Sequence, residues 1–499
     1  MPPFIFDEIP YDWVEPGVFL EVKPNYRTMG ILPWPVKNVI VGQKLATGTL
    51  APLTMVEIVR PEQAIALFGQ GSIGAEQVSA FRKANRTQPL FCMAMADDGD
   101  GVAATGTITL AGAIAASTVL RFRVAGKQVR FTAAAGASVT TLATALKDAI
   151  NADPSLVVTA TSALGVVTVT SRHKGEVGND IDLRVDTKAQ PLPAGFTAAI
   201  VAMSGGTGNP DLQDALDALG DSWVTALQHP WNDATNMAAG AAWATDRYMA
   251  MAKKDVHLHV GKRGTFAQLG TWGDLTNSPF VTCAGLDKSP TSSWVLSAAL
   301  MGLSSFHLAN DPARQLRSLV LPGVEAPDAA DQFIDTERDL LLRKGVSTFT
   351  CLDDGAVVIS RIVTTYKVSN LGVADDAWMD IMVPATMSRV RYDWASYVSL
   401  LYPRAKLVDD ESGAALAGRA EGDEDPGNAV VTPRRMHASW AARCRLYGDR
   451  AWIEDVERTV KESVFQRNTD DKNRLDSRQQ VRIVGNLMVL AGSLEFQVT

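Results

Sequence analysis

Hydrophobic and polar residues alternate with a period of two at both ends of the 499-residue chain, a pattern typical of β-strands. The residues that carry this pattern are Gly17, Val18, Phe19, Leu20 and Val22 near one end, and Leu494, Phe496 and Val498 at the other. Prolines 24, 33 and 35 follow the first segment and favour an extended arm. Because a strand at a chain end needs a partner to hold it, both termini are predicted to complete a sheet between chains.

Between these ends, short apolar runs alternate with stretches of helical periodicity, which is typical of an α/β domain. Strands are predicted at 38–42, 90–96 and 256–260, a hairpin at 347–366, and helices at 61–68, 211–219, 233–252, 292–303 and 329–342. The pattern is interrupted once. It therefore predicts a discontinuous α/β domain made of residues 36–102 and 202–375.

The interruption, residues 103–201, is rich in Ala, Thr, Val and Gly. A hairpin is predicted around Ala125 and Gly126, and Ser138 is a suitable N-cap for the helix that follows it. Further strands are predicted at 157–159, 166–170 and 181–185, with a charged turn at 172–176 beside them. The segment is interpreted as a separate β-rich module inserted into the α/β domain.

The pattern of residues 376–499 differs from that of the two preceding regions and predicts an α+β domain. Helices are expected at 389–401, 434–446 and 453–465 before the closing strands. An acidic stretch at 409–425 is interpreted as a solvated loop. The predicted fold class is thus α/β in the wider sense of an α+β multidomain chain.

Composition limits the classes of function that remain. The net charge of -8 at pH 7 argues against general nucleic-acid binding, which needs a basic face. The four cysteines lie far apart without CxxC spacing, as in proteins of a reducing compartment. The first residues lack the pattern of a signal peptide, and no apolar stretch reaches membrane-spanning length. We therefore expect cytoplasmic assembly, no direct contact with nucleic acid and no membrane insertion.

Four features of the sequence resemble parts of known chemical sites, and none of them is complete. The glycine-rich stretch 205–208 precedes a helix but lacks the Lys-Ser/Thr of a phosphate-binding loop. His257 and His259 point to one side of a strand, but a metal needs further ligands. The stretch 289–293 lacks the glycine of a serine-nucleophile turn, and the sequon at 85–87 has meaning only after secretion. We expect no active site, no metal and no cofactor.

Three stretches carry a resemblance to a known family. They are residues 16–21, residues 464–468 together with 473–476, and the closing strand unit. As an ordered set they resemble the contractile tail sheath proteins, in particular those of Mu-like bacteriophages, over nearly the whole chain. The resemblance implies an N-terminal arm at 1–35, a subtilisin-like α/β core, a protruding outer domain at 103–201, and a tube-facing C-terminal domain at 376–499 with a terminal donor strand.

The same resemblance implies a structural protein of the virion and not an enzyme. Such a subunit polymerises helically around the tail tube and contracts to drive the tube through the host cell envelope for genome ejection. Its partners would be copies of itself, the tail tube protein, and the baseplate and tail terminator proteins at the sheath ends. Contact with the tube would come from Arg458, Lys461 and Arg467. Two alternatives stay open: the sheath of a bacterial contractile device, such as a tailocin or a type VI-like secretion system, and a cytoplasmic α/β hydrolase.

Overall fold

The computed structural model describes residues 14–18, 30–416 and 430–496. Contacts between residues divide the chain into two compact units. The smaller unit comprises residues 1–33, 393–450 and 456–480, and the larger comprises 34–392, 451–455 and 481–499. Helix α9 (Met382–Leu401) contributes residues to both units. The structure has the mixed α/β character that the sequence predicts.

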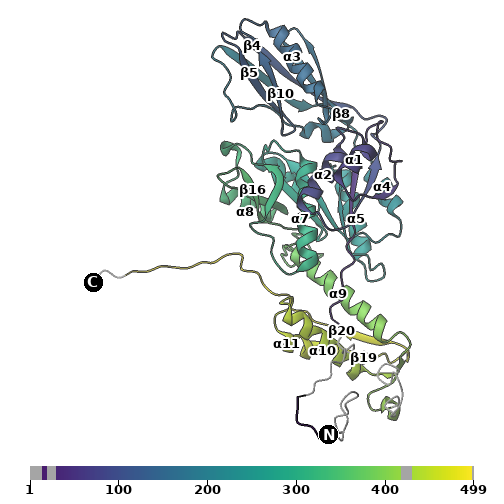
Figure 1. Cartoon of the computed structure of the whole chain (residues 1–499). Coiled ribbons are helices and arrows are strands. Elements are labelled where there is room, and N and C mark those ends of the chain that lie inside the picture. The colour runs from purple at the N-terminus through teal and green to yellow at the C-terminus, as the bar shows by residue number, and fades with distance from the viewer. Residues whose placement is uncertain (1–13, 19–29, 417–429, 497–499) are drawn as a thin grey trace. The chain divides into compact units, whose positions relative to one another are not determined.

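The centre of the larger unit is a sheet of nine described strands (Figure 1). Its strands are β1 (Asn38–Gln43), β2 (Met55–Glu57), β3 (Leu90–Met95), β11 (Ala226–Gln228), β12 (His257–Arg263), β13 (Val281–Leu286), β14 (Val320–Glu325), β15 (Val346–Cys351) and β16 (Ala356–Arg361). They lie in the order β14-β16-β15-β13-β12-β11-β1-β3-β2. The run from β15 to β3 is parallel throughout, while β16 and β2 pair antiparallel with its two outer strands.

Helices cover both faces of this sheet. They are α1 (Pro61–Phe68), α2 (Ile73–Ala84), α4 (Leu212–Leu219), α5 (Ala234–Tyr248), α6 (Phe266–Gly273), α7 (Ser293–Asn310) and α8 (Asp335–Arg343). Ile40 and Cys92 share a buried cluster with Phe81 of α2 and Met301 of α7, whereas Val41 belongs to a second cluster that includes residues of α4, α5 and α6. Strands buried on both faces are mainly apolar, which is why β3 and the centre of β1 (Val39–Val41) are apolar runs, while the buried Asn38 and Gln43 at the ends of β1 are hydrogen-bonded.

Several predicted helices differ from the structure in their bounds. The helix expected at 292–303 continues to Asn310, and the helix expected at 389–401 already begins at Met382. The helix expected at 233–252 ends at Tyr248. The helix expected at 329–342 is wrong in its first half, where a short 3₁₀ turn (Ala329–Asp331) precedes α8. The reason is that Phe333, in the link between them, turns inward and is 8% exposed.

The inserted segment forms two small sheets and one helix. The strands are β4 (Ala103–Gly112), β5 (Thr118–Val124), β6 (Lys127–Ala133), β7 (Val158–Ala163), β8 (Val166–Lys174), β9 (Leu183–Val185) and β10 (Phe196–Ser204), with α3 (Val139–Ala152) and a 3₁₀ turn (Glu176–Asp180). Their orders are β10-β4-β8-β7 and β6-β5-β9. The hairpin and the helix capped by Ser138 are confirmed. The charged turn expected at 172–176 is wrong, because β8 continues to Lys174 with His173 facing inward.

The smaller unit is mainly helical. Its elements are the second half of α9, α10 (Pro433–Asp449), α11 (Val456–Glu462), a 3₁₀ turn (Gly413–Leu416), and the strand pairs β17 (Lys406–Leu407) with β18 (Val430–Val431) and β19 (Val464–Arg467) with β20 (Leu475–Arg478). The helix expected at 453–465 is wrong at both ends. Ile453 makes a strand bridge to Ile483, and Val464 begins β19. In the part of the chain that is described, no helix is long and apolar enough to cross a membrane.

Candidate functional site

The carboxyl edge of the parallel sheet, where α/β proteins usually bind ligands, is in contact with the inserted segment. Asp97 lies just beyond β3. Its carboxylate accepts hydrogen bonds from His173 Nδ1 at 2.8 Å, Gln43 Nε2 at 2.9 Å and the Lys174 N–H at 3.0 Å. Because His173 Nε2 accepts the Ile73 N–H at 3.2 Å, the imidazole proton lies on Nδ1. Burial opposes ionisation of Asp97, but these hydrogen bonds outweigh it and lower its pKa.

A second set of polar contacts joins the same edge to Asp180 and Asp182. Asp180 Oδ2 accepts from Asn232 Nδ2 at 3.0 Å and from Ser293 Oγ at 2.8 Å. Arg263, the last residue of β12, donates to Asp182 Oδ1 at 2.7 Å. A cleft of about 730 Å³ remains beside these contacts, and none of the described residues that line it is a serine, cysteine or histidine. The chain's own side chains therefore occupy much of the position where an α/β enzyme would hold its substrate.

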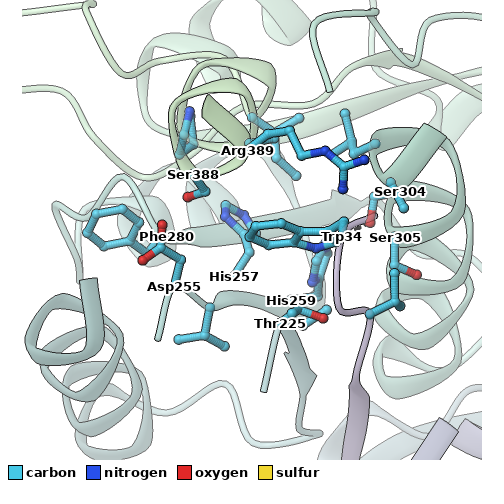
Figure 2. A pocket seen from close by; sticks show the side chains of 18 residues that line it. Trp34, Thr225, Asp255, His257, His259, Phe280, Ser304, Ser305, Ser388 and Arg389 are labelled. Carbon is cyan, nitrogen blue, oxygen red and sulfur yellow. Dashed lines mark hydrogen bonds between the residues drawn. The ribbon is translucent and has the colours of Figure 1, made fainter. Parts of the chain in front are cut away.

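A smaller pocket of about 90 Å³ lies at the opposite edge, at the amino ends of β11 and β12 (Figure 2). Its wall includes Trp34, His257, His259, Phe280 and the Arg389 side chain. The guanidinium of Arg389 lies over the Trp34 ring, 5.7 Å from its centroid. The two imidazole rings lie 5.2 Å apart between centroids. Its position at the amino edge, away from the usual ligand site of such a sheet, argues that the pocket is structural.

This pocket contains a serine–histidine pair, Ser304 Oγ and His259 Nε2, 2.8 Å apart. A catalytic pair needs an acid that orients the imidazole and a path for substrate. His259 Nδ1 has no hydrogen-bond partner among the described residues, and both side chains are buried. Burial also lowers the pKa of His259, and it lowers the pKa of His257 to about 3, so both rings are neutral at pH 7. No group of three or more possible metal ligands lies within the described residues.

At the N-terminal end, only part of the predicted strand can be placed. Gly17 and Val18 lie in the described segment 14–18, which has no strand, and Val18 is 88% exposed. Phe19, Leu20 and Val22 lie outside the described residues. The structure therefore does not test this predicted strand.

The C-terminal segment is fixed to the larger unit up to Met488 and extended beyond it. The Glu454 N–H donates to Arg482 O at 3.0 Å, and Arg317 Nη1 donates to Met488 O at 3.1 Å. Past this point the described residues form no helix or strand (Figure 1). Leu494 is 100% and Phe496 85% exposed, while Val498 lies outside the described residues. The predicted strand face is thus unpaired in a single chain.

The three predicted tube-contact residues do not lie on one helix. Arg458 and Lys461 lie on α11, whereas Arg467 lies on β19. Arg458 Nε pairs with Glu462 Oε1 at 2.8 Å, and Arg467 Nη1 pairs with Asp409 Oδ2 at 2.8 Å. Lys461 is exposed and makes no ion pair with any described residue. Two of the three cations are therefore already partly neutralised by carboxylates of the same chain.

The smaller unit contains one buried polar cluster that the sequence did not predict. Asp393 of α9 and Arg443 of α10 form an ion pair that is buried completely, at 0% and 1% side-chain exposure. The Leu32 N–H donates to Asp393 Oδ1 at 2.8 Å, so the cluster also holds the N-terminal segment. The one feature of the sequence that could have indicated this cluster is Asp393 itself, a single aspartate between Tyr392 and Trp394 in an aromatic-rich helix.

Comparison with known proteins adds the deciding observation. No family model matches the chain. It is, however, 28% identical over 492 residues to the Mu-like prophage FluMu tail sheath protein of Haemophilus influenzae, an alignment that covers 98% of this chain and 99% of that protein. The resemblance to Mu-like tail sheath proteins is confirmed. The relative that the chain resembles over nearly its full length is thus a structural protein of a tail sheath.

Solved tail sheath structures overlap the chain more weakly. The sheath tail protein of Listeria innocua is 10% identical, with a TM-score of 0.47 over 92% of this chain and 93% of that one. A contracted sheath complex of an extracellular contractile injection system is also 10% identical, with a TM-score of 0.47 over 97% and 98%. At such TM-scores these overlaps do not decide the fold of this chain.

Proposed function

We propose that the chain is a tail sheath subunit that polymerises helically around the tail tube and contracts to drive it through the host cell envelope, so that the genome is ejected. The observation that carries this proposal is the near full-length similarity to a Mu-like tail sheath protein. Assembly takes place in the host cytoplasm and the product is part of the virion. The partners are copies of the chain, the tail tube protein, and the baseplate and tail terminator proteins.

The proposed domains are an arm at 1–35, a subtilisin-like α/β core at 36–102 and 202–375, an outer domain at 103–201, and a tube-facing domain at 376–499. The mainly parallel sheet with helices on both faces supports the core. The separate sheets between β4 and β10 support the outer domain. The division of the chain into two compact units places residues 376–392 and 481–499 with the larger unit. The proposed domain boundary at 376 therefore follows the change in sequence composition and does not coincide with the boundary between the two units.

Sheet completion between subunits is the proposed role of the two termini. Apolar side chains at alternate positions are normally buried on one face of a sheet, yet Leu494 and Phe496 are exposed in the single chain. The β19–β20 pair in the smaller unit is a sheet of only two strands, and such pairs are marginal until more strands join them. Residues 17–22 of one neighbour and 494–498 of the same or another chain are proposed to complete it. Linking copies in this head-to-tail manner yields a filament.

Contact with the tube is proposed for Arg458, Lys461 and Arg467. Exposed ion pairs contribute only about 0–1 kcal/mol each. Contacts this weak could hold the sheath on the tube and still dissociate when the sheath contracts. The exposed Lys461 supports this role most directly, because it makes no ion pair with the described part of its own chain. Changing Lys461→Glu with Arg458→Glu should leave homopolymers intact and abolish co-assembly with the tube. A normal extended sheath–tube complex from this variant would exclude the proposal.

Negative-stain electron microscopy of the purified protein tests the function as a whole. Tubes or rings are expected, and discrete globules at all concentrations would contradict a sheath. A variant that lacks residues 1–22 should remain a folded monomer and form no tubes, because it lacks the strand that links neighbours. Its matched control is a variant that lacks residues 2–13 only, which retains the predicted strand and should form tubes.

A further inference from the structure

A buried polar cluster holds the N-terminal segment 30–32 against helices α9 and α10. The Leu32 N–H donates to Asp393 Oδ1 at 2.8 Å. The Gly30 carbonyl accepts from both Nη1 and Nη2 of Arg443, at 3.2 Å each. Two backbone groups of the segment thus bind the two members of one ion pair.

The ion pair itself has near-complete hydrogen bonding. Arg443 donates to Asp393 from Nε at 2.9 Å and from Nη2 at 2.6 Å, and the Tyr447 hydroxyl donates to Asp393 Oδ2 at 2.5 Å. Burial and the adjacent carboxylate raise the pKa of Tyr447, so its hydroxyl stays protonated and remains a donor. The guanidinium also lies 4.8 Å from the centroid of the Tyr397 ring. A buried charge pair is stable only when its remaining hydrogen-bonding capacity is satisfied, and here the N-terminal segment supplies part of it.

Apolar burial does not hold residues 30–32 in place, whereas Trp34 farther along packs against the rings of Trp223 and Tyr392, at 5.6 and 5.4 Å between centroids. Residues 30–36 have no regular secondary structure, and all of them are exposed or only half-buried. In contrast, Asp393, Arg443 and Tyr447 are almost completely buried. Charge-assisted hydrogen bonds inside a protein are stronger than exposed ones, so the cluster provides the firmest contacts that the segment makes with the smaller unit.

We propose that Asp393, Arg443 and Tyr447 form an anchor for the root of the N-terminal arm. The anchor makes Gly30–Leu32 a fixed point, so that a pull on the preceding residues is carried by α9 and α10 and does not reach Trp34. The importance of such a pull rests on the proposed sheath function, in which the arm links neighbouring subunits. The three side chains are positioning residues, because they act on a partner subunit only through the arm.

Replacing the cluster by apolar side chains tests the anchor in the whole protein. A triple variant, Asp393→Leu, Arg443→Met and Tyr447→Phe, leaves no buried charge unpaired and is expected to fold. Hydrogen exchange, measured by mass spectrometry, should accelerate about tenfold or more in peptides covering 30–36, as expected on losing a charge-assisted hydrogen bond, with α10 unchanged. The control is Ser463→Ala, which removes the buried hydrogen bond from Trp440 Nε1 in the same unit and does not touch the segment. Unchanged protection of 30–36 in the triple variant would overturn the proposal.

Variants on the arm itself keep the test decisive if the triple variant does not fold. Leu32→Pro removes the donor to Asp393, whereas Ile31→Pro adds the same ring without removing any hydrogen bond found among the described residues. Only Leu32→Pro should speed exchange in the flanking amides and give broken or short tubes. Equal exchange in the two variants would overturn the anchor. If the wild-type protein forms no tubes, the sheath function is wrong, and the exchange result still decides the anchor separately.

Discussion

Replacing Leu494 and Phe496 by serine should weaken assembly without changing the stability of the single chain. Both side chains are almost fully exposed in that chain, at 100% and 85%. Exposed substitutions usually change the free energy of unfolding by less than about 0.5 kcal/mol. The thermal midpoint of the monomer should therefore be unchanged.

In the polymer, both side chains are proposed to be buried against a neighbouring sheet. Each buried side chain of this size contributes about 1.5–3 kcal/mol, so the two together contribute about 3–6 kcal/mol per subunit. Ordering the arm costs about 1–2 kcal/mol per residue, but the wild type and the variant share that cost and it cancels in the comparison. At 1.4 kcal/mol for each factor of ten, the critical concentration for assembly should rise by roughly two to four orders of magnitude.

Sedimentation of polymer over a dilution series measures this concentration directly. The matched control is Leu164→Ser, which changes a leucine that is 90% exposed in the turn between β7 and β8, far from either terminus in the sequence. The control should assemble like the wild type. Should the double variant polymerise at the wild-type concentration, the terminal strand is not buried on assembly and the reasoning is wrong.

Three further predictions concern the larger unit. Burial lowers the pKa of His229 to about 4 and that of His257 to about 3. Below about pH 6.5 the unfolded chain therefore binds more protons than the folded chain does. As the pH falls from 6.5 to 5, each of these histidines should lower the free energy of unfolding by about 2 kcal/mol. Urea unfolding at both pH values measures this loss, and His257→Gln should flatten the dependence. A thiol reagent should label Cys351 first, because the other three cysteines are buried; equal labelling rates in the native protein would contradict this. Gly261→Ala should destabilise by about 1–3 kcal/mol in urea unfolding, since its Cβ would lie 2.3 Å from Ser293 O; wild-type stability would show that α7 can move away from β12.

Elements with a strong local signal could be predicted from the sequence. Ser138 accepts the Thr141 N–H at 3.2 Å, and helix α3 begins where this cap was expected. The β5–β6 hairpin turns at Ala125 and Gly126, whose φ angles of 50° and 79° lie in the left-handed region. The apolar run 39–41 likewise predicted a buried strand, which is β1. Each of these features depends on a few neighbouring residues, so a short window contains the information.

Features that depend on distant partners were missed or wrong. The sequence predicted His173 in a charged turn, but it is buried in β8, where its Nδ1–H donates a hydrogen bond to Asp97, 76 positions earlier in the chain. The sequence did not predict strands β4 and β10 individually, although they pair over residues 105–112 and 196–204. Pairing of this kind is set by the closure of the fold and not by local preference.

Some properties of the candidate functional residues likewise follow from local sequence, and others depend on distant partners. By itself, the sequence determined which residues would share the apolar face of each predicted terminal strand, because a period of two is a local property. Only the tertiary structure showed that Leu494 and Phe496 are unpaired in the single chain and that Arg458 and Arg467 already have carboxylate partners. The anchor cluster also needed the fold. Asp393 and Arg443 lie 50 positions apart on two helices, and a charged residue within a helix does not reveal its partner until packing removes both from water.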